Sequence, residues 1–564
     1  MRTLARLASV LAASALVPFA CGGSQDAADE TGGAGSPTLG GSGAGGAAAG
    51  AGGIGAAGAA GSPGGAAGTA GGGGSSAGKS GAAGAAGSAM AGAAGSGGSG
   101  AGTAGASGSG TGGAAGTAGT GGAAGVGGCV SPPDGGPTLA TPIRHLVVLM
   151  FENRTFDTLF TGFPGADTVK TAKLSTGKTI TRPKAPDGEL WSDIPHSHKA
   201  GLDAYSGGSM DGFDLLWKDH GSACASGKFA STNGYDPMSP FMAYEESQIP
   251  DLWAYAREFT LADKFFSTTL SNSEPGHFSI YAAQSPMIDN PRCNLTTPCA
   301  LGCQSKKGET EITLANAKTC AESVISPACV DVPTVFDTFP TGLSWRSYAG
   351  SSSGVPNTPI ALVKSLGTNA KSYAAHTRDY GSLVGDIQAG DLANVSYVHV
   401  GGTYDGHPPD GMCFTEKYAV NVLNAMMKSP LWASSAVLVT WDDWGGFYDH
   451  VKPAADGCDA SGNHLHTGFR VPLLVVSPWA HRSGDPAKPF VFHGASEQAS
   501  IPRLVEELFG GTTLPVGALS KQDPNARDAK AGSLLGAFDF TKGDCSTFVR
   551  PAKTCAAPAA AACP

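Results

Sequence analysis

The side chains best suited to chemistry include four oxygen donors in two short segments. Glu152 and Asn153 stand in one segment, and Asp442 and Asp443 stand in the other, each directly after a strongly apolar run. Carboxylate and amide oxygens are hard ligands that suit a divalent cation, whereas thiolates suit softer metals. Any one of the four can be an ordinary surface group. As a set they predict a site for one divalent metal ion, whose identity the residues leave open.

A serine in the segment STTLSNSEPGHFSIYAAQS is a candidate nucleophile. Ser273 looks exposed in a turn before Pro275, ahead of an apolar, helix-like run from Phe278 to Ala283. The N-terminus of a helix offers free backbone N–H groups and a favourable dipole to a phosphate. A serine hydroxyl needs activation at neutral pH, which contact with a metal ion supplies. The competing interpretation is that Ser273 is an ordinary helix N-cap.

Histidines in three loops complete the set of reactive side chains. His196 lies in SDIPHSHKAG and His407 in TYDGHPP. Either can donate a proton to a phosphate oxygen or to a leaving group, although each taken alone can be an ordinary loop histidine. His450, in FYDHV, is better placed to orient a ligand or a strand end.

These residues need a scaffold, and the sequence from Thr141 onward predicts an α/β fold. Apolar runs rich in β-branched residues alternate with helical patterns, which is typical of βαβ units. Several runs are apolar on both faces, as in the middle of a parallel sheet covered by helices. Ligands of such sheets bind beyond the carboxyl ends of the strands, where the acidic and histidine-bearing segments lie. The expected strands are 145–150, 343–348, 395–400, 435–441 and 471–477.

Three amphipathic stretches are the clearest helices. They span 249–260, 414–429 and 500–510. The first is entered by Pro250, which fits the first turn of a helix, and the last is expected to be capped at Ser500.

Composition divides the chain into an N-terminal tract and an acidic domain. Of 85 glycines, 43 lie between Thr31 and Val130, and that tract has no apolar periodicity that could form a core. Residues 22–130 are therefore expected to be a disordered Gly/Ala/Ser linker. The first 130 residues carry three basic and three acidic side chains, so the rest keeps the whole net charge of −10. This balance argues against a nucleic-acid partner.

The N-terminus resembles an export signal. Two arginines precede an apolar run from Leu7 to Ala20, which is too short to span a membrane, and Cys21 follows. We interpret residues 1–21 as a signal peptide with a bacterial lipoprotein cysteine. Lipid on Cys21 would hold the protein at the cell envelope, in contact with the membrane, and plain secretion is the alternative.

Thirteen cysteines fit an exported, disulfide-bonded protein. Five of them lie in an insertion near 290–330, where no CxxC pair occurs, so disulfides are a better interpretation than a zinc site. The pairing stays open, as does the oligomeric state. These five are Cys293, Cys299, Cys303, Cys320 and Cys329.

Taken together, the segments resemble the family of phosphoesterases that includes bacterial and plant phospholipases C and an acid phosphatase. The resemblance covers roughly 142–511 and rests on seven strings that occur in the family's order. They are FENRTFDTLF, HSHKAGLDAYSGGSMDGF, SEPGH, YDGHP, VTWDDWGGFYDHV, FRVPLLVVSPW and SEQASIPRLVEELFG.

The resemblance implies an alkaline-phosphatase-like α/β sandwich with a mainly parallel sheet, here over residues 141–545, followed by an Ala/Pro/Cys tail at 546–564. It implies that Glu152, Asn153, Asp442 and Asp443 bind the metal ion and that Ser273 is the nucleophile in contact with it. It also implies that His196, His407 and the Asn153 amide contact the phosphate. Three residues differ from those common in the family: Ser273 in place of threonine, Trp444 in place of histidine and Gly276 in place of asparagine.

The expected activity is hydrolysis of a phosphate ester through a phosphoserine intermediate. His407 or His196 would protonate the leaving alcohol, which favours a mildly acidic optimum. A phospholipid diester and a phosphomonoester both remain open as substrates. The aromatic segment 441–448 fits either an apolar rim for lipid or packing in the core.

Two other functions compete with hydrolysis of phosphate esters. A non-catalytic surface adhesion or binding protein fits the long linker, but it has no need for the combined metal and nucleophile residues. A sulfatase needs a C/S-x-P-x-R motif, and SEPGH has histidine in place of the arginine.

Overall fold

The computed structural model describes the chain from residue 129, with gaps. The predicted signal peptide, Cys21, nearly all of the linker, Cys299, Cys320 and the last eight residues lie outside the described residues. The structure describes 129, 141–188, 190, 193–220, 237–294, 302–316, 318–319, 321–352, 355–356, 358–454, 456, 466–510 and 515–556.

The centre of the fold is an eight-stranded sheet. Every neighbouring pair of strands is parallel except the two pairs that β15 makes, so the predicted mainly parallel α/β fold is confirmed. In spatial order the strands are β12 (Thr377–Asp379), β9 (Trp345–Ala349), β13 (Val395–His399), β1 (His145–Phe151), β14 (Ser435–Trp441), β15 (Leu473–Val476), β4 (Thr260–Ala262) and β16 (Val491–Phe492).

All five predicted strands are present, but the last runs against its neighbours. The sheet was predicted to be mainly parallel, and β15, which lies within the predicted strand 471–477, is antiparallel to β14 and to β4. All four residues of β15 are buried. Burial on both faces accounts for its continuous apolar character, and such burial does not depend on strand direction.

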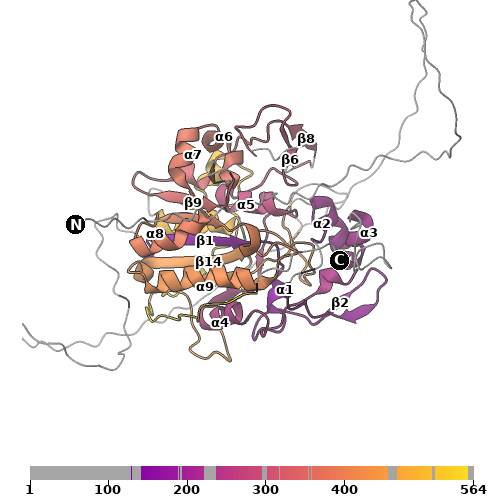
Figure 1. The fold of residues 1–564 in the computed structure, drawn as a ribbon. Helices are drawn as coiled ribbons and strands as arrows, with labels where there is room; N and C mark the ends of the chain where they lie inside the picture. The colour runs from indigo at the N-terminus through magenta and orange to yellow at the C-terminus, as the bar shows by residue number, and fades with distance from the viewer. Residues whose placement is uncertain are drawn as a thin grey trace, which may run out of the picture. The chain divides into compact units, whose positions relative to one another are not determined.

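Helices flank the sheet, and Figure 1 shows α9 next to β14, while α8 packs against α9. The helices are α1 (Phe156–Phe160), α2 (His198–Tyr205), α3 (Leu216–His220), α4 (Pro250–Glu258), α5 (Ser273–Ala282), α6 (Lys364–Gly367), α7 (Ala370–His376), α8 (Leu383–Ala389), α9 (Met412–Lys428), α10 (Ser500–Phe509) and α11 (Ala518–Gln522). No described helix has both the length and the apolar character that a membrane span requires.

The three predicted helices are α4, α9 and α10, and one predicted cap is wrong. Pro250 is the first residue of α4, as expected. Ser500, however, is the first helical residue of α10, and Ala499 occupies the N-cap position. The Ser500 hydroxyl accepts a hydrogen bond from the backbone N–H of Glu497, so it ties the preceding β17 (Ser496–Glu497) to the helix.

The Cys-rich insertion contains a small antiparallel sheet of β6 (Arg292–Cys293), β7 (Thr310–Ala315) and β8 (Glu322–Ile325). A disulfide joins Cys303 to Cys329. The other two-stranded sheets pair β2 (Thr171–Lys173) with β3 (Thr179–Thr181), β5 (Phe265–Phe266) with β17, and β10 (Ser351–Ser352) with β11 (Val355–Pro356).

Two further disulfides fasten residues close to the ends of the described chain. Cys129 is bonded to Cys545, and Cys413 at the start of α9 is bonded to Cys555. Both ends of the described region are therefore covalently joined to the sheet-containing unit.

Candidate active site

The central strands bring the predicted oxygen donors to one edge of the sheet. β1 lies between β13 and β14, with Phe151 in register with Trp441 and Met150 in register with His399. The residues that follow β1 and β14 are therefore neighbours, although about 290 residues separate them in the sequence. This edge carries the candidate site.

Helix α5 delivers Ser273 to the same edge. Asn272 is the N-cap and Ser273 is the first helical residue, so the N-cap interpretation of Ser273 is wrong. The serine is also buried, with 9% of its surface exposed, rather than exposed as its turn-like sequence indicated. The close approach of α5 to the end of β14 depends on Gly276, because a Cβ at this position would lie 2.2 Å from the backbone oxygen of Asp442.

Glu152 and Asp442 form one half of the site together with a histidine that the sequence analysis did not select. His277 Nε2 lies 3.3 Å from Glu152 Oε1 and 3.6 Å from Asp442 Oδ2. One ligand atom from each of the three residues lies within 4.8 Å of the others. His277 stands four residues after Ser273 in the SEPGH string, and one helical turn places it beside the serine, which is the signal that could have identified it.

Asn153, Ser273 and Asp443 form the other half. The Ser273 hydroxyl donates to Asp443 Oδ2 at 3.3 Å. The Asn153 amide donates to His196 Nε2 at 3.0 Å and lies 3.4 Å from Asp443 Oδ2 and 3.5 Å from Ser273 Oγ. The structure thus places a hydroxyl, an amide and a carboxylate in one contact group.

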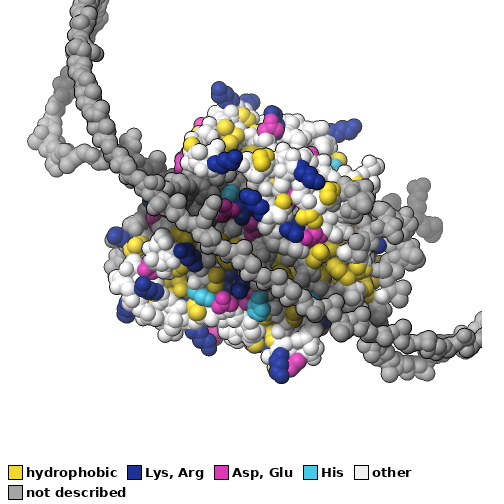
Figure 2. All heavy atoms as spheres, turned by 180° about the vertical axis from the view of Figure 1, so that it is seen from behind, with side chains coloured by type: hydrophobic (Ala, Val, Ile, Leu, Met, Phe, Trp, Pro, Cys, Tyr) yellow, Lys and Arg dark blue, Asp and Glu magenta, His cyan; other side chains and the backbone are white. Residues whose placement is uncertain are grey.

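Both predicted phosphate-side histidines face the site through Nε2, His196 toward Asn153 and His407 toward Glu152. In each ring Nδ1 donates to a backbone carbonyl at 2.6 Å, of Ile194 for His196 and of Pro408 for His407. The His407 Nε2 atom lies 3.9 Å from Glu152 Oε2, and the two rings are 6.3 Å apart between centroids. On the described part of the face in Figure 2, histidine and acidic side chains lie next to one another, while lysines and arginines are scattered.

The carboxylates of the site lack a permanent cationic partner. Among the described residues, Glu152, Asp442 and Asp443 form ion pairs only with histidines. Burial, followed by repulsion from Asp443 and Glu152, raises the pKa of Asp442 well above its ordinary value. Burial also raises the pKa of Asp443 to about 6, against the opposing effect of His196.

Two orphaned atoms show that these residues fit a cation. Within the described region, Asp442 Oδ2 and Asn153 Oδ1 are buried and accept no hydrogen bond. A buried acceptor without a donor is costly, and a divalent ion satisfies it while offsetting the charge of neighbouring carboxylates. The donor set of carboxylate oxygens and imidazole nitrogen is one that divalent metals bind.

His450 lies in a separate ionic network. Its Nδ1 is 2.7 Å from Asp157 Oδ2, and the buried Arg470 bonds both Asp157 and Asp449. This network joins the segment after β14 to α1. It fits the expected role of orienting a strand end, although His450 contacts none of the site residues above.

The aromatic side chains near the site belong to the core. Trp441, Trp444 and Phe447 have no exposed surface, and Tyr448 is 6% exposed. The interpretation of 441–448 as an apolar rim for lipid is therefore wrong. Trp444 instead packs on Phe469, and its indole N–H donates to the backbone oxygen of His196.

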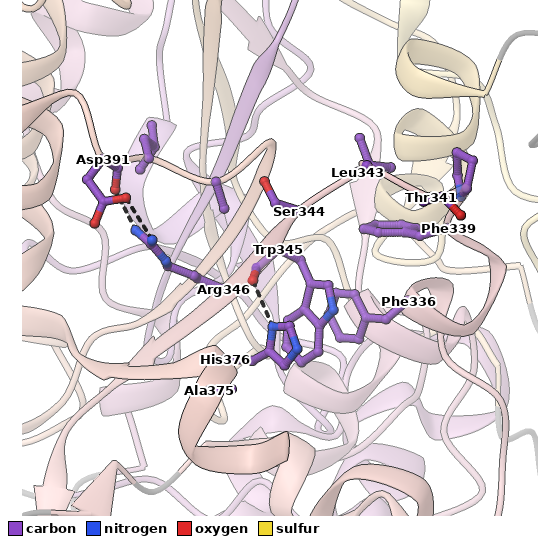
Figure 3. A pocket seen from close by; sticks show the side chains of 14 residues that line it. Phe336, Phe339, Thr341, Leu343, Ser344, Trp345, Arg346, Ala375, His376 and Asp391 are labelled. Carbon is purple, nitrogen blue, oxygen red and sulfur yellow. Dashed lines mark hydrogen bonds and ion pairs between the residues drawn. The ribbon is translucent and has the colours of Figure 1, made fainter. Parts of the chain in front are cut away.

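A cavity of about 450 Å³ lies at the start of β9, at the opposite end of that strand from its carboxyl edge. Figure 3 shows the Trp345 ring between Phe336 and His376, with ring centroids 3.7 and 4.0 Å away. Arg346 pairs with Asp391. Trp345 is stacked on both faces, and Arg346 is paired with a carboxylate. This cavity therefore has fewer side chains available for catalysis than the carboxyl edge of the sheet.

A match to a family model now gives the class of the protein. Residues 143–512 match the model of the Phosphoesterase family, and the chain belongs to this family. Its predicted membership is thereby confirmed.

Particular relatives are phospholipases C from bacteria and a plant. Non-hemolytic phospholipase C of Pseudomonas aeruginosa is 24% identical over 71% of this chain and 57% of its own length. Phospholipase C A of Mycobacterium tuberculosis is 25% identical over 72% of this chain and 79% of its own length. Non-specific phospholipase C1 of Arabidopsis thaliana is 24% identical over 72% of this chain and 73% of its own length. Together with the family, these relatives support a hydrolase that acts on phosphate esters.

A solved structure from Vibrio parahaemolyticus, described as a protein in the alkaline phosphatase superfamily, also aligns with this chain. The TM-score is 0.25 at 10% identity, over 46% of this chain and 60% of that one. This overlap is too low to carry an argument.

Proposed function

We propose that this protein hydrolyses phosphate esters through Ser273 with the help of one divalent metal ion. The observation that carries the proposal is the Ser273 hydroxyl, which donates to Asp443 Oδ2 at 3.3 Å at the N-terminus of α5. Three buried or partly buried carboxylates, an amide and three histidines make up the rest of the site. A binding protein has no chemical reason to assemble this combination.

The metal ion would be held by Glu152, Asn153, Ser273, Asp442 and Asp443. Bound there, it would stabilise negative charge on the phosphate oxygens and favour ionisation of the serine. The protein residues supply the positions, since phosphoryl transfer depends mainly on alignment and electrostatics.

The proton movements follow from the contacts of the site. As Ser273 Oγ forms its bond to phosphorus, its proton passes to Asp443, and the bond from phosphorus to the leaving alcohol breaks. His407 gives a proton to that alcohol. Water then attacks the phosphoserine and returns a proton to His407, while Asp443 returns its proton to Ser273.

Between the two histidines, His407 is the better general acid. Charges on Asp193, Glu152 and Asp405 outweigh the effect of burial and raise the pKa of His407 to about 9. Nε2 of His196 already accepts from the Asn153 amide, so His196 orients that amide toward the phosphate. The raised pKa also extends the expected activity to neutral and mildly alkaline pH, beyond the mildly acidic optimum predicted from the sequence.

The names of the relatives favour a phospholipid diester as the substrate. Phosphatidylcholine and p-nitrophenyl phosphate, tested on one preparation, separate a phospholipase C from a phosphatase. Release of diacylglycerol and phosphocholine supports the diester, and release of phosphate from the monoester alone contradicts it.

The nucleophile is tested with Ser273→Ala, and Ser279→Ala is the matched control in the same helix. Ser279 Oγ donates to the backbone oxygen of Pro275 and takes part in neither half of the site. We expect Ser273→Ala to abolish hydrolysis of p-nitrophenyl phosphate and p-nitrophenyl phosphorylcholine, and Ser279→Ala to retain it. Retained activity of Ser273→Ala on both substrates would contradict the assignment.

The metal ion is tested by chelation. Removal of the metal ion with a chelator should abolish hydrolysis, and addition of a divalent metal should restore it.

We also propose that the protein is exported and anchored by lipid at Cys21. Three disulfides in the described region support an oxidising compartment. The expected result is that the intact protein fractionates with membranes and that Cys21→Ala is released in soluble form. An unchanged membrane fraction for Cys21→Ala would contradict the anchor.

A further inference from the structure

A buried hydrogen-bonded chain leads away from His277, on the side opposite the carboxylates. His277 Nδ1 lies 2.7 Å from Nδ1 of His399, the last residue of β13. His399 Nε2 contacts the Tyr281 hydroxyl, which lies 3.0 Å from Ser347 Oγ. All four side chains are buried.

We propose that His277 is an additional ligand of the metal ion and that His399 and Tyr281 are positioning residues that fix its ligating tautomer. This inference deepens the proposed function and rests on it, because it concerns the same metal site. It adds an imidazole nitrogen to a ligand set otherwise made of oxygen atoms.

The distances at His277 suit a shared ion. Ligand atoms about 2.1 Å from one metal ion lie roughly 3.0 Å from their neighbours in an octahedral arrangement and roughly 3.4 Å apart in a tetrahedral one. Nε2 of His277 is 3.3 Å from Glu152 Oε1 and 3.6 Å from Asp442 Oδ2. Asp442 Oδ2, moreover, accepts no hydrogen bond within the described region.

The hydrogen bonds between these four side chains can run in two directions, and only one of them leaves a lone pair on His277 Nε2. In this direction His277 Nδ1–H donates to His399 Nδ1, His399 Nε2–H donates to the Tyr281 oxygen, and the Tyr281 hydroxyl donates to Ser347. The reverse direction would place the proton of a neutral His277 on Nε2, where it would block a metal. Outer hydrogen bonds of this kind orient a ligating histidine and raise its basicity.

The nitrogen ligand also narrows the range of metal ions that the site is expected to bind. Calcium and magnesium prefer oxygen ligands only, whereas imidazole suits transition ions such as zinc, iron or cobalt. We therefore expect Ca²⁺ to compete poorly for this site.

The experiment titrates metal-free full-length protein with Co²⁺ and follows its visible absorption, a readout independent of hydrolysis. We expect His277→Phe to change the Co²⁺ spectrum and to weaken binding about 100-fold. His399→Phe and Tyr281→Phe should each weaken binding about 10-fold or more. Excess Ca²⁺ should leave the wild-type spectrum unchanged.

Tyr397→Phe is the matched control for Tyr281→Phe. Its ring is 4.7 Å from that of Tyr281, and its buried hydroxyl has no hydrogen-bond partner in the described region. We expect its Co²⁺ affinity to stay within about twofold of the wild type, because it leaves the outer hydrogen bonds of His277 intact.

The comparison of Tyr281→Phe with Tyr397→Phe tests the positioning role of Tyr281 even if the His399 variant does not fold. A lowered melting temperature with unchanged Co²⁺ affinity in Tyr281→Phe would show a purely structural role and overturn the inference. An unchanged spectrum and affinity in His277→Phe would overturn it as well. Phosphate-ester hydrolysis by the wild type in either case would leave the proposed function standing.

Discussion

Replacing Gly276 by alanine tests whether the approach of α5 to the end of β14 sets the site. The added Cβ would lie 2.2 Å from the Asp442 backbone oxygen, while real Cβ contacts essentially never fall below 3.0 Å. The helix or the strand end must therefore shift by at least 0.8 Å, the difference between these two values. The clash is with backbone, so no flexible side chain can relieve it.

This shift should lower the catalytic rate more than it lowers the stability of the fold. Ser273 lies three residues before Gly276 in the same helix, so the displacement is passed to the nucleophile. A misplacement of about 1 Å costs roughly 100-fold in rate, whereas overpacking costs about 1–3 kcal/mol in stability. We expect Gly276→Ala to lower kcat on p-nitrophenyl phosphorylcholine roughly 100-fold while the protein remains folded at 25 °C.

Gly385→Ala is the matched control. Gly385 lies in α8, and a Cβ there would meet nothing within 4 Å. Alanine is the better helix former by up to about 1 kcal/mol, so this variant should keep its kcat and melt at the same or a higher temperature. Wild-type kcat in Gly276→Ala would refute the argument that this close approach positions Ser273.

Three further expectations follow from other parts of the structure. Because the pKa of His407 is raised to about 9, activity that needs its proton should persist at neutral pH and fall as the pH rises through about 9; a pH profile of kcat checks this, and His407→Asn should lose the alkaline fall along with most of the activity. Loss of the Cys413–Cys555 disulfide, with a sequence separation of 142, should cost about 5 kcal/mol, against about 3.5 kcal/mol for Cys303–Cys329 with a separation of 26, as the loop-entropy relation gives; denaturant unfolding of the paired serine variants measures the difference, and equal losses would contradict the loop-entropy explanation. Lys553→Met should lower the free energy of unfolding by about 3–5 kcal/mol, because Lys553 contacts the buried carboxylates of Asp251 and Glu416 and its removal leaves them without that cation; a change below about 1 kcal/mol would show that these carboxylates become protonated or solvated at little cost.

Much of the architecture could be predicted from local sequence. The runs that become β1, β13 and β14 are apolar on both faces because both faces are buried, and this pattern needs no tertiary information to be recognised. The antiparallel direction of β15 could not be predicted, since a strand buried on both faces has the same composition in either direction. Likewise, Ser500 has the residue type of an N-cap, but the path of the chain from β17 decided that Ala499 holds that position.

By itself, the sequence determined the donor types and the strand ends that carry them: Glu152 and Asn153 after one strand, Asp442 and Asp443 after another, and Ser273 before an apolar helix. Only the tertiary structure decided that His277 joins Glu152 and Asp442, that Tyr281 and His399 stand behind it, and that 441–448 is core. These side chains come from β13, from α5 and from the residues that follow β1 and β14. They meet because of the order of the strands and because Gly276 lets α5 approach the backbone of Asp442. Such contacts join residues more than a hundred positions apart, and no local pattern of residue types records them.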